Sequence, residues 1–243
     1  MFTVMTYNVG NGLAAAPSLV RYLRTTAADI VGLQELATSE AQAITEHLAD
    51  LYPFRVALGK GIPGKGVLSR FPLDMPQQLD LIHGRPDLCV EADVNGLPLT
   101  VLVAHPPPPR LGNIGRRAAQ ARSGQLSRLA DIAVARAPAL LMGDFNMVSW
   151  GAGHALFTAA GLRDAFQVSG TGSGFTLPMR VGHSERLNRA LGWPLLPFLR
   201  VDYIWLTSQV EVVNSWTERG AGSDHRPVLA RLQLTDDVVK ASG

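Results

Sequence analysis

The sequence predicts an α/β (α+β) protein in which two packed β-sheets are flanked by helices. Apolar runs of strand length alternate with amphipathic segments of helical period, and the strands fall into two β-rich halves with few helices. No Pro/Gly-rich linker, low-complexity stretch or short repeat divides the 243 residues, and single domains of this length are common. We therefore predict one domain over residues 1–235, followed by a flexible tail at residues 236–243.

Strands are predicted where apolar residues run continuously, or alternate with polar ones, over roughly four to eight positions. In chain order they are residues 2–8, 29–34, 66–69, 88–94, 99–105, 139–142, 201–206, 210–215 and 228–234. The first, FTVMTYN, has the pattern of a buried strand. Asn95-Gly96 provide the two-residue turn of a hairpin between the fourth and the fifth.

Helices are predicted where apolar residues recur at intervals of three and four. In chain order they are residues 17–26, 39–51, 116–136 and 153–160. Leu19, Val20 and Leu23 share one face of the first helix, and Ser39 is the predicted N-cap of the second.

Composition excludes several classes of protein. Apolar residues make up 47% of the chain and charged residues 17%, which excludes a disordered chain. No apolar run approaches the ~20 residues of a membrane-spanning helix, and the start, MFTVMTYNVG, shows no signal peptide, so we expect a cytoplasmic protein. The single cysteine, Cys89, excludes an internal disulfide and a cysteine-based zinc site, and its surroundings predict a small buried side chain.

Charge gives a weaker indication of the ligand. The 22 basic and 20 acidic residues give a net charge of +2, which is not typical of a nucleic-acid coat protein. Nineteen of the basic residues are arginines, and only Lys60, Lys65 and Lys240 are lysines. Because a guanidinium binds phosphate bidentately, this bias suits a phosphate ligand, although genomic base composition gives the same bias.

Polar side chains that are costly to bury stand at the ends of the predicted strands. They are Asn8, Glu35, His105, Asp144, Asn146, Asp202 and the pair Asp224-His225. A carboxylate in such a place carries a desolvation cost unless it is paired or binds a metal. So many polar groups at comparable strand ends predict one shared crevice with up to four negative charges.

The donor atoms in this predicted crevice suit a hard divalent ion. Carboxylate and amide oxygens without thiolates favour Mg²⁺ first and Mn²⁺ second. Together with His105 and His225, such an ion would provide a Lewis acid and proton-transfer groups for attack at phosphorus.

Seven segments, in this order, resemble the motifs of the endonuclease/exonuclease/phosphatase family. They are TYNVG, VGLQE, GKGVLSRFP, LVAHPP, MGDFN, RVDYIW and SDHRPV. The family includes pancreatic deoxyribonuclease, exonuclease III, apurinic endonucleases, neutral sphingomyelinases and inositol polyphosphate 5-phosphatases. The match runs from Thr3 to about Leu232, and all seven motifs together are far more specific than GDFN or SDHRP alone. The resemblance implies a four-layer sandwich of two packed mixed β-sheets flanked by helices, with a Mg²⁺-dependent site at one edge of the sheets.

The resemblance also implies roles for the polar strand ends. Glu35 matches the family's metal-binding glutamate, and Asn8 the asparagine that holds the metal or the neighbouring aspartate. Asp224 is the adjacent carboxylate that can also take metal. Asp144 matches the aspartate that orients or activates the attacking water, and Asn146 the asparagine that contacts phosphate.

Two histidines complete the set that the resemblance implies. His225 matches the catalytic histidine and Asp202 the aspartate that orients it, while His105 matches the phosphate-contacting histidine of the deoxyribonuclease and sphingomyelinase branches. The family's mechanism is disputed as to which group handles the water's proton, and we expect Asp144 to do so while His225 stabilises or protonates phosphate oxygens. Gly10-Asn11 stand where apurinic enzymes carry a further aspartate, and with His105 this departure weighs against abasic-site repair.

Basic side chains are candidates for substrate binding. The segment GKGIPGKG at residues 59–66 departs from a P-loop, because Gly66 takes the Ser/Thr position and a strand follows it, but Lys65 or Lys60 could reach a substrate phosphate. On the helix over residues 116–136, Arg116, with Arg117 and Arg122, either forms a solvated face or clamps a nucleic-acid backbone.

The segment GWPLLPFL at residues 192–199 is unusually apolar for a connection. It either packs on a sheet edge or at an oligomer contact, or it places Trp193, Leu196 and Phe198 beside the crevice as a lip for the substrate.

We therefore expect a Mg²⁺-dependent phosphoesterase that hydrolyses a phosphodiester by in-line attack of water. The arginines and the many nuclease branches of the family favour nucleic acid as the substrate. The apolar segment and the low charged fraction favour the alternative, a phospholipid or small-molecule phosphodiester. Few lysines disfavour an inositol phosphate phosphatase, and the presence of Glu35, Asp144 and His225 disfavours a non-catalytic scaffold. The oligomeric state stays open.

Overall fold

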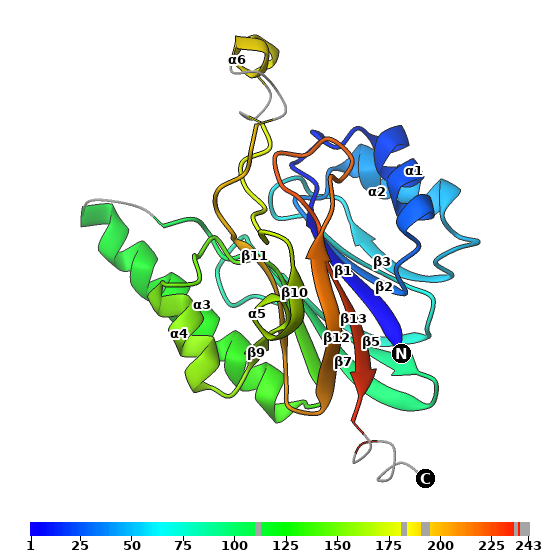
Figure 1. Ribbon diagram of the computed structural model, residues 1–243, viewed down its shortest axis with the longest axis vertical. Coiled ribbons are helices and arrows are strands. Elements are labelled where there is room, and N and C mark those ends of the chain that lie inside the picture. Colours follow the sequence, from blue (N-terminus) through cyan, green and yellow to red (C-terminus); the bar gives the residue numbers. More distant parts are fainter. Residues whose placement is uncertain (110–112, 181–183, 191–194, 236–237, 239–243) are drawn as a thin grey trace.

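The computed structural model describes residues 1–109, 113–180, 184–190, 195–235 and 238 (Figure 1). A seven-stranded sheet has the order β10-β12-β13-β1-β2-β4-β3. Its strands are β1 (Phe2–Asn8), β2 (Ile30–Gln34), β3 (Phe54–Leu58), β4 (Lys65–Ser69), β10 (Gly170–Thr171), β12 (Val210–Thr217) and β13 (Val228–Leu234). A six-stranded sheet has the order β5-β6-β7-β8-β11-β9. Its strands are β5 (Leu73–Leu79), β6 (Asp87–Val94), β7 (Leu97–Ala104), β8 (Ala139–Asp144), β9 (Arg163–Asp164) and β11 (Asp202–Leu206).

Both sheets are mixed, and helices cover their outer faces. Strand β1 pairs parallel with β2 and antiparallel with β13, and β8 pairs parallel with β7 and antiparallel with β11. The helices are α1 (Ala16–Thr26), α2 (Thr38–His47), α3 (Asn113–Ala135), α4 (Ala152–Ala159), α5 (Ala165–Ser169) and α6 (Glu185–Ala190). One core cluster packs α1 and α2 on the seven-stranded sheet, and another packs α3 and α4 on the six-stranded sheet. With the apolar core between the sheets, these contacts make four layers, as predicted (Figure 1).

The two-residue period of the strands carries the polar strand ends to the face between the sheets. In β8, Leu140 and Met142 lie in the core between the sheets, so Asp144 continues the same face at the end of the strand. The same alternation follows Val103 of β7 to His105, directly after that strand. The predicted crevice is therefore the polar end of the inter-sheet core.

An arm projects from the body of the molecule at this end of the sheets. We use the arm for residues 175–180 and 195–200 together with α6. Leu177 and Leu199 exchange backbone hydrogen bonds of 3.0 and 2.9 Å, and the Leu195 N–H donates to the Met179 carbonyl at 2.9 Å. In Figure 1 the arm rises above the sheets and carries α6 at its tip.

The structure adds several elements to the predicted ones, among them the short strands β9 and β10 and the short helices α5 and α6, and helix α2 ends at His47, before the predicted residue 51. Strands β3 and β5 were not predicted, because they are the two outermost strands of their sheets at that side and their side chains are largely exposed or half-buried. The prediction of Ser39 as an N-cap is wrong. Helix α2 begins at Thr38 with Ala37 as its N-cap, and the Ala37 N–H donates to the Glu40 carboxylate at 2.7 Å. Cys89 is 2% exposed, in agreement with the prediction of a buried side chain.

Candidate active site

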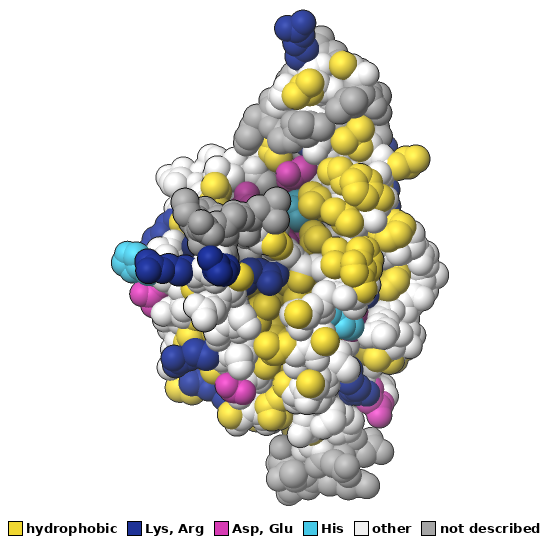
Figure 2. All heavy atoms as spheres, turned by 90° about the vertical axis from the view of Figure 1, so that its left-hand side faces the viewer, with side chains coloured by type: hydrophobic (Ala, Val, Ile, Leu, Met, Phe, Trp, Pro, Cys, Tyr) yellow, Lys and Arg dark blue, Asp and Glu magenta, His cyan; other side chains and the backbone are white. Residues whose placement is uncertain are grey.

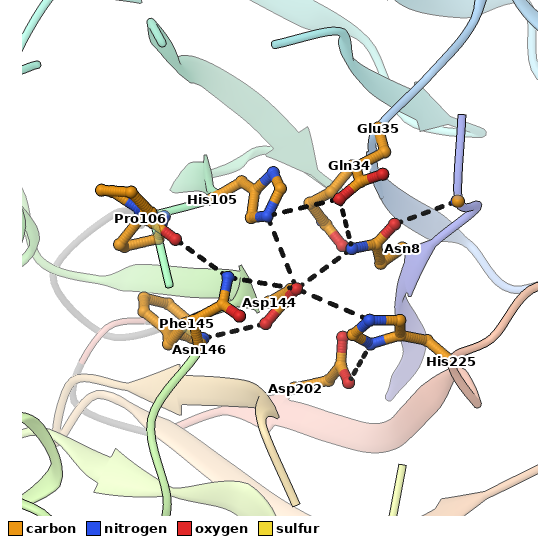
Figure 3. A network of polar contacts seen from close by, with 12 residues as sticks. Asn8, Gln34, Glu35, His105, Pro106, Asp144, Phe145, Asn146, Asp202 and His225 are labelled. Carbon is orange, nitrogen blue, oxygen red and sulfur yellow. Dashed lines mark hydrogen bonds and ion pairs between the residues drawn. The ribbon is translucent and has the colours of Figure 1, made fainter. Parts of the chain in front are cut away.

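The Asp144 carboxylate lies at the centre of the crevice (Figure 3). Its Oδ2 accepts a hydrogen bond from Asn8 Nδ2 at 3.0 Å. The ring Nε2 atoms of His105 and His225 lie 3.5 and 3.7 Å from the same oxygen. Its Oδ1 accepts a hydrogen bond from the backbone N–H of Asn146 at 2.8 Å. Residues from β1, β7, β8 and the loop before β13 thus meet on one carboxylate.

His225 joins two carboxylates that stand opposite each other on β8 and β11. Asp202 pairs with Asp144 in the strand register, and His225 Nδ1 lies 2.9 Å from Asp202 Oδ2. Burial alone would lower the pKa of His225, but the charges of Asp202 and Asp144 outweigh burial and raise this pKa to about 10. Burial also raises the pKa of Asp144, against the opposing effect of the His225 imidazole. Without a metal, His225 is therefore an imidazolium at neutral pH.

Glu35 and Asn8 form the opposite wall of the crevice. Asn8 Nδ2 lies 3.4 Å from Glu35 Oε1, and Asn8 Oδ1 accepts a hydrogen bond from the Gly10 N–H at 3.0 Å. Glu35 follows the last residue of β2 and has a left-handed backbone with φ of 53°, which costs a non-glycine residue roughly 1–3 kcal/mol and is concentrated at functional sites. Burial raises the pKa of Glu35; the Asn8 hydrogen bond opposes this, and the Asp144 charge adds to it. The Asn8 amide thus lies between two carboxylates that repel each other.

His105 is held from behind by a buried carboxylate. Its backbone N–H donates to Asp87 Oδ1 at 3.2 Å, and Gln125 Nε2 of α3 donates to Asp87 Oδ2 at 2.7 Å. Burial lowers the pKa of His105 to about 4, and the Asp144 charge only partly opposes this shift. Within the described part of the chain, His105 Nδ1 is buried and has no hydrogen-bond partner. The two imidazoles that face Asp144 therefore have opposite protonation states at neutral pH.

Arg122 lies on α3 and holds the loops beside Asn146, a role that the sequence did not predict. Its guanidinium donates to the backbone carbonyls of Pro107, Phe145 and Asn146 at 3.0, 2.8 and 3.0 Å. Its half-buried position and these partners contradict the predicted solvated face, and the predicted contact with a nucleic-acid backbone stays a prediction. Nothing in the sequence marks Arg122 for this role, because its partners are carbonyl groups from segments far away along the chain.

The hydroxyl groups of Tyr7 and Ser223 tie the loop of His225 to β1. Ser223 Oγ donates to the Asn8 carbonyl at 2.7 Å and accepts from the His225 N–H at 3.2 Å. The Tyr7 hydroxyl accepts from the N–H groups of Ala221 and Ser223 at 2.8 and 3.3 Å. Sequence reasoning passed over both residues, although each stands inside one of the seven motifs beside a predicted site residue.

Gly143 permits the close approach of β7 and β8 just before Asp144. Its φ is 154°, and a Cβ atom there would lie 1.9 Å from the Ala104 carbonyl oxygen. Any other residue would push the two strands apart, and with them His105 and Asp144.

The crevice holds donors that suit a divalent metal. One oxygen each of Asp144 and Asp202 and a ring nitrogen of His225 lie within 4.8 Å of one another. Asp202 Oδ1 is buried without a hydrogen-bond partner among the described residues, so a ligand could satisfy it. Glu35 and Asp144 offer a second set of carboxylate oxygen atoms on either side of the Asn8 amide, which turns its Nδ2 toward them while its Oδ1 accepts from the Gly10 N–H. Oxygen donors with one imidazole fit a hard or borderline cation and not a thiophilic one.

The remaining predicted residues lie at different distances from this centre. Asp224 is half-buried beside the crevice, where its Oδ1 accepts from Ser223 Oγ at 3.2 Å and its charge adds to the raised pKa of Glu35. Lys65 is 2% exposed, and its Nζ donates to the Pro63 carbonyl at 3.4 Å, so its ammonium lies inside the protein. Arg116 is exposed on α3. Trp193 lies outside the described residues.

Comparisons with known proteins identify the family and the fold. Residues 5–225 match the model of the endonuclease/exonuclease/phosphatase family. A search of curated proteins found no match. Among solved structures, an endonuclease/exonuclease/phosphatase from Beutenbergia cavernae superposes with a TM-score of 0.73 at 23% identity, covering 96% of this chain and 71% of that chain.

Two further solved structures have the same fold. Humanized D. rerio TDP2 superposes with a TM-score of 0.71 at 19% identity, covering 96% of this chain and 98% of that chain. Sphingomyelinase C from Streptomyces griseocarneus superposes with a TM-score of 0.65 at 21% identity, covering 94% of this chain and 98% of that chain. The family model spans most of the sequence and all eight polar strand-end residues, so the chain belongs to the endonuclease/exonuclease/phosphatase family.

Proposed function

We propose that this protein is a Mg²⁺-dependent phosphodiesterase that hydrolyses nucleic acid by in-line attack of water. The observation that carries the proposal is the position of the Asp144 carboxylate between the His225–Asp202 pair and the Glu35–Asn8 wall. Asp144 would be the base, His225 the cation, and the wall of Glu35 and Asn8 the place for a metal. Attack of water on a phosphodiester needs these three parts.

We assign the metal to the wall formed by Glu35 and Asn8, with Asp224 beside them. His225 Nδ1 already binds Asp202, and an imidazolium repels a cation, so the cluster of Asp144, Asp202 and His225 is the poorer place for Mg²⁺. When bound, the ion would supply a Lewis acid and neutralise negative charge on the phosphate.

The protein's own groups divide the proton transfers. In the metal-free protein the charges of Asp202 and Asp144 raise the pKa of His225 to about 10, and its Nδ1 is held by Asp202, so we assign it the role of donor to a phosphate oxygen. This leaves Asp144, whose raised pKa improves it as a base, to take the proton of water. Neutral His105 and the Asn146 side-chain amide, which donates to the Pro106 carbonyl at 3.0 Å, are placed to contact the other phosphate oxygens.

A second candidate substrate, a phospholipid or another apolar phosphodiester, is favoured by one observation. An apolar groove of about 430 Å³ reaches Asn146 and is walled mainly by Met147, Val148, Leu177, Leu199 and Val201. On the arm beside it, Leu196 is 86% exposed and Phe198 62% exposed. Figure 2 shows hydrophobic side chains gathered below the arm, beside histidine and carboxylate atoms. In the described residues, no helix has the length and apolar character to cross a membrane.

The proposal is tested by a panel of substrates with and without Mg²⁺: plasmid DNA, single-stranded DNA, RNA, sphingomyelin vesicles and bis-p-nitrophenyl phosphate. We expect Mg²⁺-dependent cleavage of nucleic acid and of the chromogenic diester, both lost in Asp144→Asn. Cleavage of sphingomyelin alone would favour the second candidate. In that case Leu196→Ala with Phe198→Ala should raise KM for the lipid and leave the chromogenic diester unchanged. Absence of metal-dependent hydrolysis across the panel would contradict the proposal.

A further inference from the structure

A second groove reaches the crevice at His225 and, unlike the apolar groove, is not lined by Asn146; we call it the basic groove. It has a volume of about 440 Å³ and runs from His225 and Ser223 to the outer face of α1. One wall is the loop of residues 219–223 between β12 and β13, and the other carries Ser18, Arg21, Tyr22 and Thr25 of α1. Figure 1 shows this loop at the same end of the molecule as α1. Ligand sites commonly have volumes of roughly 300–1,000 Å³, so the basic groove is large enough for part of a substrate.

The charged side chains of this groove have one sign. Arg21 lines it from α1 and Arg219 from the loop, and both are exposed. Neither guanidinium has a hydrogen-bond or ion-pair partner among the described residues. The carboxylate next to Arg219, that of Glu218, is engaged by the Tyr22 hydroxyl at 2.8 Å and by Trp216 Nε1 at 2.9 Å.

The contrast with Arg24 shows that this is not the general state of arginines on α1. Arg24 stands three residues after Arg21 on the same helix, and its guanidinium binds Asp50 through two hydrogen bonds of 2.8 Å and also donates to the His47 carbonyl. Arg24 therefore has a partner within the protein, whereas Arg21 and Arg219 line the same groove and neither has an ion-pair or hydrogen-bond partner for its guanidinium among the described residues.

We infer that Arg21 and Arg219 form a second phosphate-binding subsite, which holds a phosphate next to the scissile one in a nucleic-acid strand. Two unpaired guanidinium groups on opposite walls suit a phosphodiester, which each can bind bidentately. The groove ends at His225, so a strand with its scissile phosphate in the crevice has a path along it. The inference rests on the proposed function, and it makes the preferred substrate one with more than one phosphate.

The test compares kcat/KM for bis-p-nitrophenyl phosphate, a dinucleotide with one phosphate, and oligothymidylates of three to eight residues. In the wild type, kcat/KM should rise once a second phosphate is present. In Arg21→Ala with Arg219→Ala it should fall by about tenfold or more for the longer oligomers relative to the single-phosphate substrates. Arg21→Lys keeps the charge and should retain part of the gain, and Arg24→Ala is the matched control that should change neither class. Equal losses on all substrates, or no loss on any, would overturn the subsite.

A binding measurement separates this inference from the proposed function. Fluorescence anisotropy with a labelled dT12 in EDTA needs no hydrolysis. The variant with Arg21→Ala and Arg219→Ala should bind dT12 more weakly. The slope of the logarithm of the binding constant against the logarithm of the salt concentration should flatten by about 0.7 for each lost phosphate contact with the single strand. If the panel finds no hydrolysis but this difference is present, only the proposed function fails. If nucleic acid is neither bound nor cut while sphingomyelin is hydrolysed, the subsite is wrong and the phosphodiesterase remains.

Discussion

Asp144 and Asp202 stand directly opposite each other on antiparallel strands β8 and β11, and the imidazole of His225 lies between their carboxylates. Two like charges at a directly opposed pair normally destabilise a sheet. Here His225 Nδ1 is 2.9 Å from one carboxylate and Nε2 is 3.7 Å from the other, so a single imidazolium compensates both. The protonation of His225 therefore depends on the two carboxylates of this strand pair, Asp144 and Asp202.

The first prediction concerns Asp202, which acts through His225. Asp202→Asn removes one of the two charges that raise the pKa of His225, so it should lower both that pKa and kcat. We expect a loss of about 10–100-fold in kcat, the range for residues that orient another group, against at least ~10²–10⁴-fold for His225→Ala. In steady-state kinetics across pH, the fall in rate that accompanies deprotonation of His225 should occur at a lower pH in the variant than in the wild type. Equal losses with identical pH profiles would contradict the positioning role.

The second prediction concerns the two imidazoles in the metal-free protein. NMR titration should find His225 protonated until the pH nears 10 and His105 neutral down to about pH 4. Because the folded-state pKa of His225 is raised, its contribution to stability is full below about pH 6.5 and is lost as the pH rises toward 10. Because the folded-state pKa of His105 is lowered, its contribution is full above about pH 6.5 and is lost as the pH falls toward 4. Both histidines titrating near 6.5 would contradict the burial and charge arguments.

The third prediction concerns Asp144 as the base. Asp144→Asn keeps the shape of the side chain and should lower kcat by at least ~10²–10⁴-fold, because an amide cannot accept the proton of water. Circular dichroism and thermal unfolding should show an intact fold. A rate above about a tenth of the wild type would contradict the assignment. Asp131→Asn on the exposed part of α3 is a control that should leave kcat unchanged.

The fourth prediction concerns the metal. EDTA should abolish hydrolysis, and Mg²⁺ or Mn²⁺ should restore it. Since the Asp144 charge raises the pKa of Glu35 across the Asn8 amide, a cation between the walls should also raise Tm. Differential scanning calorimetry with and without Mg²⁺ measures this shift, which should be smaller in Glu35→Gln. Full activity in EDTA would exclude the metal.

The fifth prediction concerns Arg122, which holds backbone carbonyls around the crevice. Arg122→Ala leaves the carbonyls of Pro107, Phe145 and Asn146 without their donor and should lower the free energy of unfolding by about 1–3 kcal/mol. Denaturant titration measures the loss, with Arg128→Ala on an exposed position of the same helix as the control. The salt dependence of oligonucleotide binding should stay unchanged, because Arg122 already has its partners inside the protein. A flatter salt slope would instead indicate a phosphate contact.

The fold and the centre of the site could be predicted because both depend on strong local patterns. Strand β1 has the predicted bounds, since Phe2–Asn8 is a continuous buried run, and its two-residue period places Asn8 on the inner face. Strand β5 escaped prediction because an edge strand buries little, and LDMPQQL contains a proline and two glutamines. Arg122 and Ser223 show the limit for side chains, because Arg122 and the Ser223 hydroxyl bind carbonyl groups from distant segments, which a local pattern does not encode.

The hydrogen bond between Asn8 and Asp144 joins residues that are 136 positions apart, one in each sheet. Contacts of such sequence separation form late in folding, because the entropy of closing the intervening loop must be overcome first. His225 comes from the loop just before β13, and that strand pairs with β1 at the middle of the seven-stranded sheet. The hydrolytic centre is consequently absent from any intermediate in which the sheets have not yet docked, and recovery of activity during refolding measures completion of the whole domain.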